Sequence, residues 1–296
     1  MPSAFSRRKI QPTNKPLHTP ANYLTIDVED YFQVAALKEV VGPHTNWDNY
    51  PARVDSNTRI ILGLLGKYNV KATFFIVGWI AEKFPQLVKD IHAAGHDIGC
   101  HSYYHRLIYD LTPAEFRRDT KTAKDILEQI IGQPVLTYRA PSYSITRKSL
   151  WALDILEELG FSRDSSIFPI RHDRYGIADA PRFKYKIPGH NLIEYPISTS
   201  IFLGRKIPVS GGGYFRLFPY WFTRMALKKI NRQDRQSFIF YIHPWEIDPG
   251  QPRLNGLSAL SKFRHYNNLE KTASRFEQLL TDFSFVPVGK KSTIIK

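Results

Sequence analysis

Short apolar segments alternate with helical segments along this chain, and this alternation restricts the fold more than any other feature of its sequence. A strand–helix–strand alternation places the strands parallel in one sheet with the helices on its outside. The expected strands cover residues 23–28, 71–78, 96–99, 135–140, 161–164, 192–196, 237–243 and 283–288. We therefore expect an α/β fold, a single deformed (β/α) barrel of about seven strands with an irregular insertion around residues 167–220.

Helix signals occupy most of the intervals between these strands. The expected helices cover about residues 55–69, 79–94, 112–131, 146–159, 219–230 and 267–281. Residues 112–115 (Thr-Pro-Ala-Glu) form a capping box with proline at the first helical position. Asp55 is expected to cap the first helix, and Gly95 is expected to end the second.

Residues 167–220 interrupt the alternation, because they are rich in Pro, Gly, Arg and Tyr. Long irregular segments within a compact domain usually carry function, so we interpret this one as a cover over the site. Residues 210–213 (Ser-Gly-Gly-Gly) lack the Lys-Ser/Thr pair of a phosphate-binding loop, which favours a structural turn.

The chain carries a formal net charge of +14, which favours an acidic partner: nucleic acid, anionic lipid headgroups or an anionic polysaccharide. No nucleic acid is expected, because the sequence has no helix-turn-helix pattern, no Cys/His finger and no ribonucleoprotein aromatic signature. The single cysteine, Cys100, excludes an intrachain disulfide.

The sequence contains neither an apolar run long enough for a transmembrane helix nor an apolar segment of a secretory signal at its start. We expect a cytoplasmic protein, with peripheral contact to the inner membrane as an alternative. Residues 1–21 contain four prolines and a basic cluster and are expected to form a flexible basic arm. Residues 22–296 would then form one domain.

Polar side chains follow several of the expected strands. They are Asp27, Glu29 and Asp30 after the first strand, His101 and His105 after the third, Arg139 and Asp164 at the next two, and His243 after a late one. In a parallel barrel the carboxyl ends of the strands meet at one rim, which is where such enzymes have their chemistry. Two imidazoles four residues apart suit a divalent metal, which also needs a carboxylate. Taken singly, the acids would also suit a solvated turn, and the histidines a surface or capping position.

Five short motifs occur in a fixed order along the chain. They are residues 25–30 (Thr-Ile-Asp-Val-Glu-Asp), 101–105 (His-Ser-Tyr-Tyr-His), 138–143 (Tyr-Arg-Ala-Pro-Ser-Tyr), 164–166 (Asp-Ser-Ser) and 241–244 (Tyr-Ile-His-Pro). In this order they resemble the five motifs of the NodB-like polysaccharide deacetylases, carbohydrate esterase family 4, over residues 22–288. The start Asp-Val-Glu-Asp, the segment Gly-Gly-Gly-Tyr-Phe-Arg and the ending His-Pro-Trp-Glu resemble a branch associated with bacterial exopolysaccharide and exosortase gene clusters.

The resemblance implies hydrolysis of N-acetyl groups on amino sugars of a bacterial polysaccharide, or of its precursor, with a bound divalent metal. Zinc is the expected metal, with cobalt, nickel or manganese as alternatives. The partner would be an N-acetylated polysaccharide or oligosaccharide, and the positive charge would suit one that is anionic or lipid-linked. The family's roles fall on Asp27 (general base), His101 and His105 (metal ligands), Arg139 (partner of the base), His243 (general acid) and Asp164 (in the motif that orients the acid).

The first motif departs from the family pattern, in which two aspartates are adjacent. Val28 follows Asp27 here, so the metal carboxylate must be Glu29 or Asp30. Strand alternation places Glu29 on the side of Asp27, so we prefer Glu29.

The fourth motif lacks the family's usual tryptophan, which leaves open a degenerate protein of the same fold that binds glycan without cleaving it. Candidate sugar-contacting residues are Pro141, Tyr143, Tyr214 and Trp245, with core packing as the alternative. Arg216 would contact an anionic group or lie on a solvated basic face.

Overall fold

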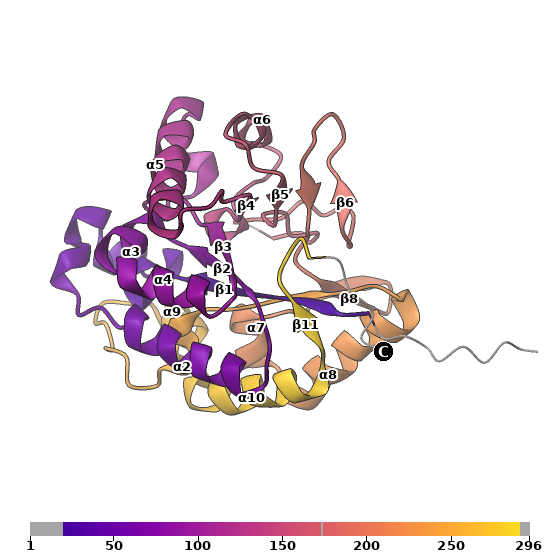
Figure 1. Cartoon of the computed structure of the whole chain (residues 1–296). Coiled ribbons are helices and arrows are strands. Elements are labelled where there is room, and N and C mark those ends of the chain that lie inside the picture. Colours follow the sequence, from indigo (N-terminus) through magenta and orange to yellow (C-terminus); the bar gives the residue numbers. More distant parts are fainter. Residues whose placement is uncertain (1–19, 173, 291–296) are drawn as a thin grey trace, which may run out of the picture.

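In the computed structural model, which describes residues 20–172 and 174–290, a curved sheet forms the centre and helices pack on its outside (Figure 1). The strands follow the order β10-β1-β2-β3-β4-β5-β7-β6, in which all neighbours are parallel except the antiparallel pair β7 and β6. They are β1 (Asn22–Val28), β2 (Thr73–Ile76), β3 (Asp97–Cys100), β4 (Thr137–Tyr138), β5 (Arg163–Asp164), β6 (Tyr185–Lys186), β7 (Ile193–Glu194) and β10 (Ile239–Ile242). A further strand, β11 (Phe285–Val286), pairs with the start of β1. The parallel run from β10 to β7 confirms the expected α/β fold, a deformed and partly open barrel.

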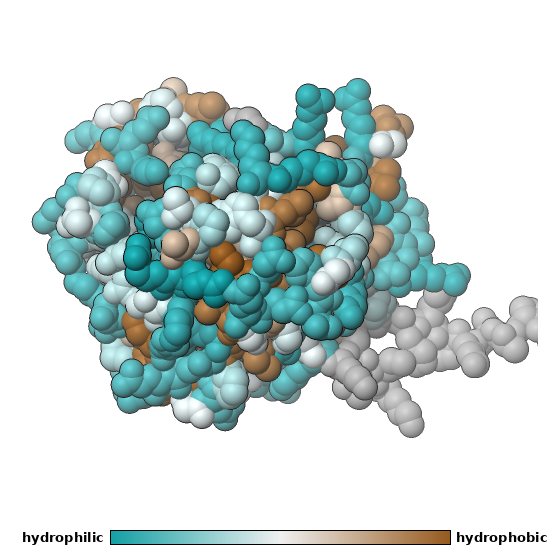
Figure 2. Space-filling view, turned by 90° about the horizontal axis from the view of Figure 1, so that it is seen from above, coloured by the Kyte–Doolittle hydropathy of each residue, from teal (hydrophilic) through white to brown (hydrophobic). Residues whose placement is uncertain are grey.

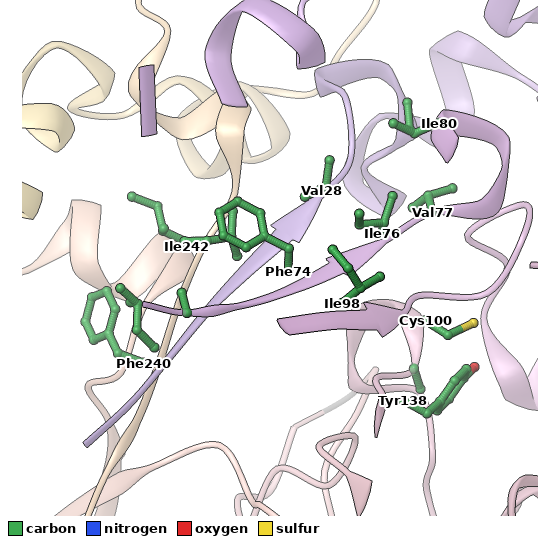
Figure 3. Packing of buried hydrophobic residues seen from close by; sticks show 14 of the residues in the cluster. Val28, Phe74, Ile76, Val77, Ile80, Ile98, Cys100, Tyr138, Phe240 and Ile242 are labelled. Atoms are coloured by element: carbon green, nitrogen blue, oxygen red, sulfur yellow. The ribbon is translucent and has the colours of Figure 1, made fainter. Parts of the chain in front are cut away.

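The side chains of β1 alternate between two buried faces. Leu24, Ile26 and Val28 belong to the large apolar core that also contains residues of β2, β3 and β10 (Figure 3). Tyr23 belongs to a smaller cluster on the opposite face of the sheet. Because side chains alternate along a strand, Asp27 lies on the same side as Tyr23, which is the inside of the barrel.

Ten α-helices lie in the described part of the chain. They are α1 (Lys38–Val41), α2 (Val54–Lys67), α3 (Gly78–Lys83), α4 (Pro85–Ala93), α5 (Pro113–Ile131), α6 (Trp151–Glu158), α7 (Gly212–Leu217), α8 (Tyr220–Lys229), α9 (Ala259–Tyr266) and α10 (Leu269–Asp282). Short 3-10 turns cover Tyr31–Gln33, Ala35–Leu37, His44–Asn49, Ile108–Asp110, Pro141–Tyr143 and Pro244–Ile247, and a π-helical turn covers Ile230–Asp234. The capping box at Thr112 and Glu115 is confirmed. The helix expected over residues 79–94 is two helices, since Pro85 begins the second.

The start of α2 differs from its expected form. The helix begins at Val54, so Asp55 is its second residue and not its cap. The carboxylate of Asp30 accepts hydrogen bonds from the backbone nitrogens of Arg53 (2.7 Å) and Val54 (2.9 Å). A side chain that follows β1 therefore accepts hydrogen bonds from the free backbone N–H groups at the start of α2. Local sequence signals do not reveal this contact.

The insertion forms part of the barrel wall, because β6 and β7 belong to the main sheet. It contains the hairpin of β8 (Thr199–Phe202) and β9 (Arg205–Pro208), after which Gly211 pairs with Tyr241 of β10. Gly211 has a φ of 138°, and a Cβ there would lie 2.0 Å from the Tyr241 carbonyl oxygen. The glycine run thus permits close backbone packing against β10, in agreement with the expected structural turn.

The surface in Figure 2 is mainly hydrophilic, and its hydrophobic residues are gathered in small areas between hydrophilic ones. Among the described residues, none of the helices is long and apolar enough to span a bilayer. The proposed arm falls almost wholly on residues 1–19, which lie outside the described residues.

Candidate metal and catalytic site

The carboxyl ends of four parallel strands bring the predicted site residues together. Asp27 is on β1, and Glu29 follows that strand by one residue. His101, Arg139 and His243 each follow directly after β3, β4 and β10. Parallel strands end at the same rim, so residues far apart in sequence meet there.

Glu29, His101 and His105 form a group that could hold a metal ion. All three are buried, and their potential ligand atoms lie within 4.8 Å of one another. Glu29 Oε2 lies 2.5 Å from His105 Nε2 in a contact without hydrogen-bond geometry, and it makes no hydrogen bond to the other described residues. His101 Nδ1 lies 2.7 Å from the Arg139 carbonyl oxygen, so Nδ1–H donates there and leaves Nε2 as the ligating atom. An orphaned buried carboxylate oxygen beside two imidazoles fits a divalent cation.

The backbone of the loop after β3 is shaped for this group. Ser102 and His105 have φ values of 61° and 51°, in the left-handed region. The Ser102 hydroxyl lies 2.6 Å from the Tyr138 hydroxyl, and the Ser102 carbonyl accepts from Gly78 N at 2.8 Å. These contacts hold an unfavourable turn that carries His105 back toward Glu29.

The structure distinguishes between the two candidate metal carboxylates. Asp30 is turned away from the histidines, and its oxygens accept from the backbone of Tyr31, Arg53 and Val54. Burial raises the pKa of Asp30 to about 6 despite these bonds. The geometry therefore favours Glu29 as the metal carboxylate, which is the residue that strand alternation indicated. Asp30 instead links the end of β1 to the start of α2.

Asp27 is held by a buried arginine. Its Oδ1 accepts from Arg139 Nη1 at 2.6 Å, and the same nitrogen donates to Thr25 Oγ1 at 2.7 Å. The other nitrogens of the Arg139 guanidinium donate to Ser165, to its carbonyl oxygen at 3.1 Å and its hydroxyl at 2.7 Å. The guanidinium also lies 4.3 Å from the centroid of the Phe75 ring. These contacts fix the carboxylate so that Oδ2 faces His243 Nε2, at 3.8 Å.

His243 is oriented by a residue that the sequence interpretation did not assign. Glu246 Oε2 lies 3.0 Å from both His243 Nδ1 and the His243 backbone nitrogen. Arg216 Nε donates to the other oxygen of Glu246 at 2.8 Å, and both side chains are buried. Arg216 is thus neither a solvated cation nor an exposed anion ligand, contrary to both expectations. The spacing His-x-x-Glu in the ending His-Pro-Trp-Glu is the signal that could have identified Glu246.

The pairing expected between Asp164 and His243 is not what the structure shows. Asp164 accepts from Ser166 Oγ at 2.5 Å and lies opposite Glu194 in the register of β5 and β7. Burial raises the pKa of Asp164 to about 6, and burial together with the neighbouring Asp164 raises the pKa of Glu194 well above its usual range. Asp164 therefore supports the barrel wall near Arg139, and Glu246 takes the position beside the imidazole.

The charges of the site follow from its contacts. Burial lowers the pKa of His101 to about 4, which keeps its imidazole neutral as a ligand must be. Burial opposes charge on Glu29, but His105 and His243 outweigh it and hold the pKa of Glu29 well below its usual range. Burial also opposes charge on His243, yet Glu29, Glu246 and Asp27 raise its pKa to about 9. An imidazolium beside ionised carboxylates is the arrangement that a general acid requires.

A cavity of about 870 Å³ is lined by two of the four predicted sugar-contacting residues and not by the other two. Tyr214 and Trp245 line it. Pro141 and Tyr143 are buried, and the Tyr143 ring packs 5.2 Å from that of Tyr241. The indole nitrogen of Trp245 donates to Glu29 Oε1 at 3.1 Å, so this side chain also supports the candidate metal carboxylate.

Two family models match this chain, and both begin after Asp27 and Glu29. Residues 37–162 match the family model "Polysaccharide deacetylase", and residues 165–292 match a domain of unknown function, DUF3473. The first match identifies a polysaccharide deacetylase (NodB-type) domain within residues 37–162. The site takes His101, His105 and Arg139 from the first matched region and His243 and Glu246 from the second.

Similarity to individual proteins covers parts of their length. The chain is 34% identical over 117 residues to a peptidoglycan-N-acetylglucosamine deacetylase of Bacillus cereus, which is 36% of this chain and 42% of that protein. It is 31% identical over 86 residues to the peptidoglycan-N-acetylmuramic acid deacetylase PdaC of Bacillus subtilis, 29% of this chain and 18% of that protein. The chain spans about half or less of the length of the curated relatives it matches. The crystal structure of a "putative polysaccharide deacetylase" from Mycobacterium smegmatis shares the fold, with a TM-score of 0.55. The superposition covers 95% of this chain and 96% of that chain, at 20% sequence identity.

Proposed function

We propose that this chain is a metal-dependent deacetylase that hydrolyses N-acetyl groups of amino sugars in a bacterial polysaccharide or its precursor, within exopolysaccharide or cell-surface glycan biosynthesis. The observation that carries the proposal is the meeting of three groups on one rim. These are the Asp27–Arg139 pair, the Glu29, His101 and His105 cluster, and the His243–Glu246 pair.

The candidate metal group is Glu29, His101 and His105, with zinc as the expected ion and cobalt, nickel or manganese as alternatives. The donor set of one carboxylate and two imidazoles is one that zinc enzymes use with an open position. When bound, such an ion supplies Lewis acidity for the amide carbonyl and lowers the pKa of water.

Asp27 is suited to act as the general base. Arg139 fixes its Oδ1 and leaves Oδ2 facing His243. In the proposed reaction, Asp27 accepts the proton of the attacking water, and Arg139 holds the carboxylate in place by a charge-assisted hydrogen bond.

His243 is suited to act as the general acid. Glu246 accepts from its Nδ1–H, so Nε2–H points into the site beside Asp27. About 16% of the His243 side chain is exposed, whereas its carboxylate neighbours are nearly closed to solvent, so a substrate can reach it. His243 would donate its Nε2 proton to the leaving amine nitrogen, which completes cleavage of the amide.

Acetate release from an N-acetylglucosamine tetramer tests this proposal. The full chain should lose activity after treatment with a chelator and regain it on addition of zinc or cobalt. Activity that persists after complete removal of the metal would contradict the proposed mechanism. Glycan binding without acetate release, in metal-loaded protein, would instead support the degenerate glycan-binding alternative.

A further inference from the structure

The cavity lined by Tyr241 and Trp245 combines rings with aliphatic side chains. Sugar recognition accounts for the rings but not for the aliphatic part of the wall. The apolar lining includes Val34, Ala35, Ala36, Leu107, Leu217, Leu260 and Phe263. The rings and polar groups of the lining suit a sugar, whereas aliphatic side chains offer neither aromatic faces nor hydrogen bonds. The aliphatic part of the wall suits a hydrocarbon chain.

The mouth of the cavity leaves apolar side chains in contact with water. Leu217, Leu260 and Phe263 are 46%, 57% and 52% exposed, respectively. They come from α7 and α9, and all three line the cavity. Exposed apolar groups around a concave opening indicate a ligand that covers them.

The ionic groups around the cavity favour an anionic headgroup. Lys38, Arg174 and Arg264 line it, against the one acid Glu39 among its described lining residues. Arg216 also lines it but pairs with Glu246, and Lys38 Nζ lies 4.0 Å from the Asp110 carboxylate. The guanidinium groups of Arg174 and Arg264 complement a phosphate next to the hydrocarbon chain.

The cavity adjoins the proposed reaction centre through two of its walls. Trp245 donates to Glu29 at 3.1 Å and stacks on the His243 ring with 5.3 Å between centroids. The Tyr241 ring lies 5.6 Å from that of His243. An apolar group in the cavity would therefore place an attached sugar beside the general acid.

We propose that this cavity receives the hydrocarbon chain of a lipid-linked amino-sugar phosphate, so that the substrate is an amphiphile and not a free polymer. The inference rests on the proposed deacetylase function, which requires an N-acetylated sugar at the head of the lipid. The cavity adds a substrate class to that function, because the residues at the rim of the barrel do not specify one.

Calorimetric titration of the full chain tests the inference without turnover. The two probes are N-acetylglucosamine decyl phosphate and N-acetylglucosamine methyl phosphate, which differ only in the length of the chain. Each buried methylene adds about fourfold in affinity, so burial of four of them makes the decyl probe at least about 100-fold tighter. Leu260→Asp and Phe263→Asp should each remove most of this difference and leave binding of the methyl probe within about twofold. Ile60→Asp, at a 52% exposed position of α2 outside the cavity, is the matched control and should leave the difference intact.

Equal affinity for the two probes, or the same loss in the Ile60→Asp variant, overturns the inference. So does concentration-dependent self-association of the wild type that Leu260→Asp abolishes, because a second copy would then cover the opening. Acetate release from the soluble tetramer is a separate measurement. A protein that deacetylates the tetramer but ignores the decyl chain disproves the cavity assignment alone, and one that binds the decyl probe without any turnover disproves the deacetylase alone.

Discussion

Two pairs of buried carboxyl groups in this barrel lie at similar depth in different surroundings. Asp27 and Glu29, at the end of β1, face Arg139 and two histidines. Asp164 and Glu194, on β5 and β7, face each other, with Ser166 and the backbone nitrogen of Ile167 as their hydrogen donors. The pKa of Glu29 is held well below its usual range, whereas burial raises those of Asp164 and Glu194. Burial therefore does not decide the charge of a carboxyl group here, and the groups that it contacts do.

The largest expected effect separates the two pairs by activity. Asp27→Asn should lower kcat for acetate release at least about 1,000-fold, because an amide cannot accept the proton of water. Asp164→Asn should change kcat by less than about tenfold, since its carboxyl only supports the wall. Metal content, measured by elemental analysis, should stay the same in both variants. Equal losses of kcat in the two variants would show that the two pairs of carboxyl groups do not differ in function.

The next largest effect is on the free energy of unfolding, and it follows from removal of Arg139, the cation beside Asp27 in the first pair. Arg139→Met leaves Asp27 buried without its partner and should lower the free energy of unfolding by about 3–5 kcal/mol. Arg59→Met is the control, because Arg59 forms exposed ion pairs with Asp55 and Asp90 and should cost less than about 1 kcal/mol. Urea denaturation measures both. A loss for Arg139→Met no larger than that of the control would show that Asp27 does not depend on its cation.

The second pair should make stability depend on pH in one direction. Its pKa values are higher in the folded than in the unfolded chain, so folding binds protons. The stability from this pair is fully present below about pH 4, where unfolded carboxyls are also protonated. The part from Asp164 is lost as the pH rises through about 6, and the part from Glu194 is lost as the pH rises through its own raised pKa. For Asp164 the loss is of the order of 3 kcal/mol.

The double variant Asp164→Asn/Glu194→Gln should remove this dependence, because amides mimic the protonated pair. Denaturation curves of wild type and variant between pH 4 and pH 8 give the comparison. The wild type should lose stability relative to the variant as the pH rises. A difference that stays constant over this range would mean that the pair is ionised after all.

The smallest expected effect concerns the residue that orients His243. Glu246→Gln should lower kcat about 10- to 50-fold with little change in KM, because the amide holds the ring without its charge. The exposed Glu158→Gln is the control. An unchanged kcat in the Glu246 variant, at equal metal content, would show that the imidazole needs no carboxylate partner.

The sequence predicted those parts of the fold and site that depend on local periodicity. Short apolar strands ending in polar residues placed Asp27 and His243 at one rim, and the alternation of β1 favoured Glu29 over Asp30. The capping box at Thr112 is likewise a local signal. Such features need only a few neighbouring residues, so a single sequence contains them.

The features that the sequence did not predict depend on contacts between distant segments. The facing of Asp164 and Glu194 follows from the register of two strands thirty residues apart. The start of α2 depends on a carboxylate more than twenty residues upstream. The helices α7 and α9 border the cavity, but their short spans give too few turns for a helical period to be recognised.

The burial of Cys100 has a practical consequence for studying this molecule. It is the single cysteine of the chain, it has no exposed surface, and burial raises the pKa of its thiol further above neutrality. Thiol reagents attack the exposed thiolate, so Cys100 should remain unmodified in the folded protein. A cysteine placed at the mouth of the cavity, as in Leu260→Cys, would then be the sole reactive thiol, and a fluorophore attached there would report ligand entry without any change to the native cysteine.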